Sequence, residues 1–188
     1  MNSREMIRGR MMARVALLVG TWLVTSGSNS SCSFNSGSGS SSGQPPANSA
    51  TFTSTLKLRN VSGVETASFV FGEPVRFDFE IVNRTDRQQR LQFPDAQTHD
   101  FLVVNNRSVQ VRWMWSDGQG FAQVSTELMF EPYASKTFTL YWPGTLADGT
   151  HLPVGSYEAR GALVFDGFEA NPLANSELAS DLEAFEVR

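Results

Sequence analysis

The stretch Val75-Arg-Phe-Asp-Phe-Glu-Ile-Val-Asn83 decides the fold of this chain. Its large apolar residues, Phe77, Phe79 and Ile81, alternate with acidic ones, so apolar side chains recur with a period of two. Because successive side chains of a β-strand point to opposite faces, this pattern predicts a strand with one buried and one solvated face. Such a strand needs a second layer of structure to cover its apolar side.

Short segments of the same kind lie on both sides of this strand. They are rich in Thr, Val and aromatic residues, and Gly, Pro, Asn or Asp separates most of them. Together with 75–83 they predict about eight or nine strands and no long amphipathic helix, which favours an all-β sandwich. The further predicted strands are 51–59, 90–93, 100–104, 109–115, 124–130, 135–142, 155–165 and 182–187. Residues 67–71 form either a short strand or an extended lead-in, and residues 176–184 allow a helical turn.

The aromatic residues of these strands are expected to fill the core between two sheets, about 10 Å apart. Phe138, Leu140 and Trp142 recur at every second position and are predicted to point inward. A hairpin is predicted to turn at Asn105-Asn106, because Asn tolerates a positive φ. One face of its second strand is expected to hold Val109, Val111, Trp113 and Trp115.

Composition limits the classes of partner. The chain has 188 residues, 40% hydrophobic and 18% charged, enough for one domain with a packed core. Its formal net charge is −4, but from residue 32 onward eleven basic residues face eighteen acidic ones, a formal charge of −7. An acidic domain argues against nucleic acid as a partner, because phosphate binding needs clustered Lys and Arg. It argues equally against adsorption to an anionic membrane surface.

The first 49 residues carry targeting signals. A basic start, an apolar run at 15–24 and small residues before Cys32 form the pattern of a signal peptide, residues 1–31. The apolar run is too short for a transmembrane helix, which needs about 20 apolar residues. Residues 32–49, mostly Ser and Gly with two Pro, are expected to be a flexible tether. The domain is therefore expected at 50–188, in an exported protein.

Cys32 is the only cysteine, so the domain must hold by packing without an internal disulfide. Its place between a signal peptide and a flexible tether resembles a bacterial lipoprotein, in which that cysteine carries a lipid. Lipoproteins have an aliphatic residue three positions earlier, where this chain has Asn29. Three outcomes stay open: lipidation of Cys32 at the cell envelope, cleavage within 25–31 that releases a secreted or periplasmic protein, and an uncleaved anchor. Membrane contact is expected through the N-terminal segment only.

No residue pattern indicates catalysis, a cofactor or a metal site. His99-Asp100 and His151 are the only histidine positions, and no Ser on a constrained strand-to-helix turn accompanies them. Asp117, Asp148 and Asp166 each precede Gly, which is first of all turn chemistry. They lack the regularly spaced oxygen ligands of a calcium loop. We therefore expect no enzyme, no cofactor and no bound metal.

A sparse set of residues follows the strands between 73 and 163. It consists of Phe77-x-Phe79-x-Ile81-x-Asn83, Leu91-Gln-Phe93, Asp100-Phe101, Trp113-Met-Trp115-Ser116, Phe121, Tyr141-Trp142 and Pro153-x-Gly155-x-Tyr157. In this set the chain resembles the BsuPI-type intracellular proteinase inhibitors. The resemblance implies an immunoglobulin-like antiparallel β-sandwich and a non-enzymatic module that binds a protein partner, a serine protease by the family's name. The matching positions are core and turn residues, so no reactive-site residue carries over.

Two polar loops are the candidate binding loops. One comprises Ser116, Asp117, Gly118, Gln119 and Gly120, and the other, 144–152, contributes Leu146, Asp148 and Leu152, with the two leucines as apolar anchors. A loop held by the sandwich would enter a protease cleft like a substrate strand, because preorganisation lowers the ordering cost of binding. The alternative function is a structural or assembly role at the cell envelope, with the sandwich docking a partner protein through an edge strand.

Overall fold

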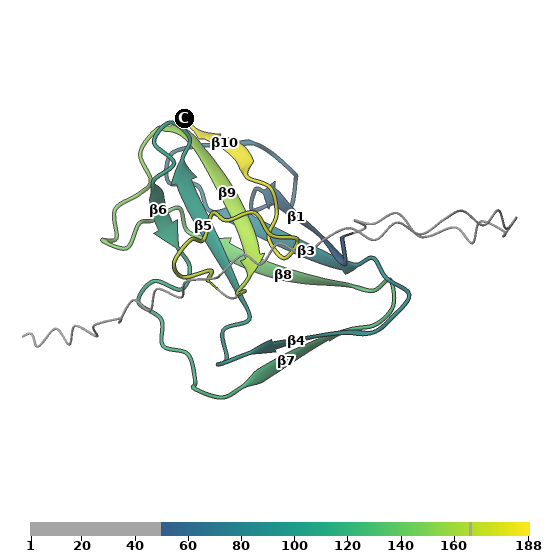
Figure 1. The fold of residues 1–188 in the computed structure, drawn as a ribbon. Helices are drawn as coiled ribbons and strands as arrows, with labels where there is room; N and C mark the ends of the chain where they lie inside the picture. Colours follow the sequence, from purple (N-terminus) through teal and green to yellow (C-terminus); the bar gives the residue numbers. More distant parts are fainter. Residues whose placement is uncertain (1–49, 166) are drawn as a thin grey trace, which may run out of the picture. The chain divides into compact units, whose positions relative to one another are not determined.

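The computed structural model describes residues 50–165 and 167–188 (Figure 1). The signal peptide, the tether and Cys32 lie outside these residues. Within the described part there are ten strands and no helix, and hence no helix able to span a membrane. The strands are β1 (Phe52–Arg59), β2 (Ser68–Phe69), β3 (Val75–Asn83), β4 (Gln89–Phe93), β5 (His99–Asn105), β6 (Val111–Met114), β7 (Thr126–Phe130), β8 (Ser135–Trp142), β9 (Gly155–Leu163) and β10 (Glu183–Val187).

Two sheets form the predicted sandwich. One has the order β1-β3-β8, with both pairs antiparallel, and the other has the order β2-β10-β9-β5-β6. Among the described strands, the two-residue strand β2 is the only one that pairs in parallel, and its partner is β10. Strands β4 and β7 pair with each other as a separate antiparallel ribbon, which Figure 1 shows beside the sandwich. The all-β, immunoglobulin-like sandwich predicted from the sequence is confirmed.

The alternation in β3 produces the core. Phe77, Phe79 and Ile81 are each 0% exposed, while the residues between them are only half-buried. Phe77 stacks on Phe101 of the opposite sheet at a centroid distance of 5.7 Å. Trp142 is 2% exposed, as its inward position in β8 predicts.

Gly161 in β9 sets how closely the two sheets approach. A Cβ atom at this position would lie 2.6 Å from Cγ of Phe79 and 2.7 Å from its Cβ. Real Cβ contacts essentially never reach that distance, so a side chain here would have to move the Phe79 ring or the β9 backbone. The absence of a side chain at Gly161 therefore lets Phe79 pack directly against β9.

Asn83 ends β3 and anchors the β4–β7 ribbon. Its side chain is 0% exposed and donates to the carbonyls of Arg87 (2.7 Å) and Glu131 (2.9 Å). Its amide oxygen accepts the Thr85 N–H at 3.0 Å and the Thr85 hydroxyl at 2.8 Å. One buried side chain thus binds two of the four connections between the sandwich and the ribbon, the one from β3 to β4 and the one from β7 to β8.

The hairpin between β5 and β6 differs from the prediction. Val109 does not lie on the strand with Val111: it has a φ of 53° and is 54% exposed. The turn spans 105–109, because the Asn105 side chain accepts the N–H groups of Arg107 and Ser108 at 3.0 and 3.1 Å. The turn therefore consumes residues that the alternation alone assigned to the strand.

We expect Gly161→Ala to destabilise the domain because of the contact with Phe79. Overpacking of this kind costs about 1–3 kcal/mol. Chemical denaturation of both variants measures the difference, with Gly120→Ala as the control, since a Cβ at Gly120 has no atom within 4 Å. Equal stability of the Gly161→Ala variant and the wild type would show that the sheets separate at no cost.

Candidate functional site

One buried carboxylate fixes the base of loop 116–120. Asp100 is 1% exposed and accepts the Ser116 hydroxyl at 2.5 Å and the Ser116 N–H at 3.2 Å. The Phe101 N–H at 2.7 Å and the Gln97 side-chain amide at 3.1 Å bind the same carboxylate. Burial raises the pKa of Asp100, and the hydrogen bonds from Ser116 and Phe101 oppose that rise. Asp100-Phe101 and Trp115-Ser116 thus form one structural unit.

The exposed tip of this loop is a closed turn. The Gln119 N–H donates to the Ser116 carbonyl at 3.0 Å, and its side-chain amide donates to the Trp115 carbonyl at 2.7 Å. Gly118 has a φ of 77°, a conformation that glycine adopts at little cost. Residues 117–120 are all exposed. The loop is therefore held rigidly, but it is not the extended segment that a substrate-like loop requires.

A row of aromatic rings supports the loop from below. The Trp115 ring stacks on His99 at 5.1 Å, and His99 lies 4.3 Å from the ring of Phe138 in the other sheet. Phe121 contacts Trp115 edge-on at 5.7 Å. Burial lowers the pKa of His99 to about 4, so the ring is neutral at pH 7. The row extends from the loop across to the sheet that contains β8.

Loop 144–152 is also a closed turn. The Leu146 N–H donates to the Thr150 carbonyl at 2.8 Å, and the Asp148 carboxylate accepts the Thr150 N–H at 2.9 Å and its hydroxyl at 2.6 Å. Leu152 is 2% exposed and belongs to the core, and Leu146 is half-buried against it. Leu152 therefore supports the fold instead of contacting solvent. Asp148 is exposed, but its carboxylate caps the turn.

The two loops lie at opposite ends of β9. Loop 144–152 closes shortly before Gly155, where β9 begins. Ser116 of loop 116–120 is hydrogen-bonded to Asp100. His99, the residue before Asp100, pairs with Leu163, where β9 ends. One flat partner surface therefore does not contact both loops head-on, and the two are separate candidates.

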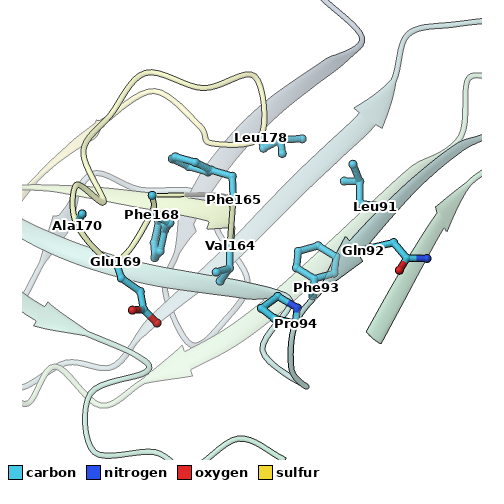
Figure 2. Close-up of a pocket in the computed structure, with 11 residues that line it drawn as sticks. Leu91, Gln92, Phe93, Pro94, Val164, Phe165, Phe168, Glu169, Ala170 and Leu178 are labelled. Atoms are coloured by element: carbon cyan, nitrogen blue, oxygen red, sulfur yellow. The ribbon is translucent and has the colours of Figure 1, made fainter. Parts of the chain in front are cut away.

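A groove that the sequence analysis missed lies at the Leu163 end. It has a volume of about 860 Å³ and separates β4 from the segment after β9. Figure 2 shows Leu91 and Phe93 on one side and Phe165 and Phe168 on the other. The lining is mostly apolar, with Glu169 as its charged residue. Phe165, at the end of the predicted strand 155–165, and Phe168, just after it, were the available signal in the sequence.

Ser116, His99 and Asp100 lie together, but not in the order of a catalytic relay. Asp100 binds Ser116 directly, whereas a relay needs His between them. The His99 Nδ1 atom is 3.1 Å from the Thr98 hydroxyl instead. Nor do any three His, Cys, Asp or Glu side chains of residues 50–165 and 167–188 lie close enough to share a metal ion.

We expect His99 to make the domain less stable as the pH falls from about 6.5 to about 4. Its pKa is lower in the folded protein, so over this range the unfolded chain binds more protons. Proton binding lowers the free energy of the unfolded state relative to the folded state. The effect is at most about 3 kcal/mol. The pKa of Asp100 is raised, so its contribution has the opposite sign and is lost as the pH rises above its ordinary value.

Denaturation midpoints of the wild type and of His99→Phe, measured from pH 7 to pH 4, isolate the contribution of His99. Phe keeps an aromatic ring in the row and does not titrate. The stability of the wild type should fall relative to that of the variant as the pH decreases. Parallel pH profiles would show that His99 is protonated freely in the folded domain.

The sequence profile of one protein family, described as "BsuPI: Intracellular proteinase inhibitor", matches residues 48–167. A comparison with curated proteins gives no match. Among solved structures, the C-terminal domain of wzt is 12% identical, with 77% of this chain and 80% of that chain covered and a TM-score of 0.47. The CARDB domain of a Pyrococcus furiosus protein is 11% identical, with 75% and 97% covered and a TM-score of 0.37. These two likenesses are too distant to carry an argument about function.

The family match covers well over half of the chain, from just before β1 to just after β9. It includes every residue of the sparse set found in the sequence, from Phe77 to Tyr157. The resemblance is therefore confirmed: the chain belongs to the BsuPI intracellular proteinase inhibitor family.

Proposed function

We propose that the domain is a non-enzymatic inhibitor that binds a serine protease. The observation that carries this proposal is the family match over residues 48–167, because the family is described as an intracellular proteinase inhibitor. The family description points to an inhibitory role. The binding surface on this domain and the class of protease that it binds are our inference. The geometry supports a contact at the Leu163 end of β9, where a rigid loop and an apolar groove occur together.

Loop 116–120 supports the proposal because it is exposed and already ordered. Its base is bonded to the buried Asp100, and its tip is closed by Gln119. Binding to such a loop removes little conformational entropy from it. More of the favourable energy of the contacts therefore remains as binding affinity. The groove between β4 and the segment after β9 adds apolar surface that can accept a partner's side chain.

The closed form of both loops changes the expected mode of inhibition. A substrate-like inhibitor presents an extended segment whose backbone pairs with the protease, and neither loop has that shape. We infer that the domain covers the entrance of the protease cleft or binds beside it. Such an inhibitor is not cleaved during binding, and its inhibition is weaker against very small substrates.

Titration of the purified chain against serine proteases of differing primary specificity tests the proposal. We expect saturable inhibition of at least one protease at a ratio near one to one, with the inhibitor intact afterwards. Asp117→Arg should weaken inhibition tenfold or more, about 1.4 kcal/mol, because a long cation replaces an exposed acid at the loop tip.

Ala147→Arg is the matched control, since it places the same side chain on the exposed tip of the other loop. Inhibition that is lost with Ala147→Arg and kept with Asp117→Arg would move the binding surface to loop 144–152. Inhibitor recovered as two fragments split within either loop would contradict the covering mode. Lack of inhibition across the whole panel would count against the proposal itself.

We further propose that the domain acts outside the cytoplasm, attached to a membrane through a lipid on Cys32. The support is the sequence pattern of residues 1–49, nearly all of which precede the family match that begins at residue 48. Mass spectrometry of the mature N-terminus, from protein made in its native host, should find an acylated peptide that begins at Cys32. An unmodified start within 25–31 indicates a released protein, and an N-terminal Met1 indicates that no export occurs.

A further inference from the structure

Strand β8 leaves one side of the three-stranded sheet open. It is the last strand in the order β1-β3-β8, and its eight residues pair only with β3 among the described residues. Its outward side chains, those of Ser135, Thr137, Thr139 and Tyr141, are exposed and uncharged, and Tyr141 is 60% exposed. The one charged residue of β8, Lys136, is half-buried on the opposite face of the strand, with its Nζ atom 5.6 Å from the centroid of the Phe130 ring. The outward side chains of this long edge therefore carry no charge that would oppose pairing with another chain.

The hydrogen-bond alternation shows which residues of β8 can pair with a further strand. The Asn83 N–H donates to the Ala134 carbonyl at 2.9 Å, so this pair is hydrogen-bonded across β3 and β8. In an antiparallel pair such bonds occur at every second residue, which directs the backbone groups of 136, 138 and 140 toward β3. The N–H and C=O groups of 135, 137, 139 and 141 therefore point to the open side.

The other edges of the two sheets are covered or short. On β1 the Phe52 N–H is bound by the Glu177 carboxylate at 3.2 Å, and the Leu58 carbonyl accepts the Thr66 N–H at 3.0 Å. Strand β2 has two residues, and β6 has four and pairs irregularly with β5. Natural proteins keep edge strands from pairing with other chains by covering them, by making them short or by making their pairing irregular. β8 has none of these features.

We propose that β8 is covered by β8 of a second copy, which joins two domains into one six-stranded sheet. Antiparallel pairing with the two-fold axis at Phe138 satisfies the geometry. It places Ser135 opposite Tyr141 of the second copy and Thr137 opposite its Thr139. All four residues with outward backbone groups then form hydrogen-bonded pairs, and no charged residue faces another.

This register also fits the side chains. Side chains that face each other across strands lie on the same face of the sheet, and here even-numbered residues face even-numbered ones. The two copies of Phe138, each half-buried and stacked on Phe79 at 6.0 Å, meet at the axis. An axis at Thr139 would instead place Ser135 opposite Pro143, which has no N–H to donate. Symmetric pairs of this type are the commonest form of oligomer.

The oligomeric mass of the full chain in solution, measured over a range of concentrations, tests the proposal. We expect the mass of two chains, falling to that of one in Thr137→Pro. Pro removes an N–H that faces the open side, so the substitution breaks no bond within the domain. Thr137→Val keeps that N–H and is the matched control, which should remain a dimer.

Cross-linking tests the register even if Thr137→Pro fails to fold. In a Cys32→Ser background, a chain with Thr137→Cys should form a disulfide with a chain carrying Thr139→Cys, because hydrogen-bonded pairs have Cα atoms about 5.5 Å apart. Thr139→Cys alone should not cross-link. A single-chain mass at all concentrations, or a dimer unaffected by Thr137→Pro, would overturn the proposal, and efficient cross-linking of Thr139→Cys alone would overturn the register.

Discussion

The contact between Phe79 and the backbone of Gly161 is the constraint on which the rest of the structure depends. At this point the two sheets are as close as a strand without a side chain permits. The ring of Phe79 also meets Phe101 edge-on at 6.4 Å and stacks on Phe138, so it joins β3, β5, β8 and β9. With the sheets fixed here, the positions of Asn83 and of Asp100, near the ends of their strands, are fixed as well.

Three buried polar side chains then carry this order into the irregular segments. Asn83 binds two of the four connections to the β4–β7 ribbon, and Asp100 binds loop 116–120. Arg160 is 5% exposed and donates to the carbonyls of Ser180 (2.8 Å) and Ala174 (3.1 Å) in the segment before β10. Each satisfies backbone groups that water would otherwise have to bind. The groove is lined by β4 of the ribbon and by residues between β9 and β10, and loop 116–120 is a separate feature at the same end of β9. Hydrogen bonds from buried side chains thus attach these candidate surfaces to the core.

Sequence periodicity predicted the sandwich because it reports which side chains are buried. The alternation of Phe77, Phe79 and Ile81 has the same physical cause as their 0% exposure. It failed at Val109, where the Asn105 side chain replaces strand pairing with a turn, a competition that hydrophobic pattern does not register. The groove was missed for a different reason. Its walls come from β4 and from residues after β9, and a contact between segments so far apart leaves no local pattern.

The candidate loop and the open edge of β8 are physically connected. Phe121, Trp115, His99 and Phe138 form a continuous row of rings from the loop to the centre of β8. His99 lies in the middle of this row, and burial keeps it neutral by lowering its pKa to about 4. A charge on that ring would have to be solvated, which is why burial disfavours the protonated form. The proposed pairing at β8 and the proposed protein contact at the loop would therefore lie at the two ends of one row of packed rings.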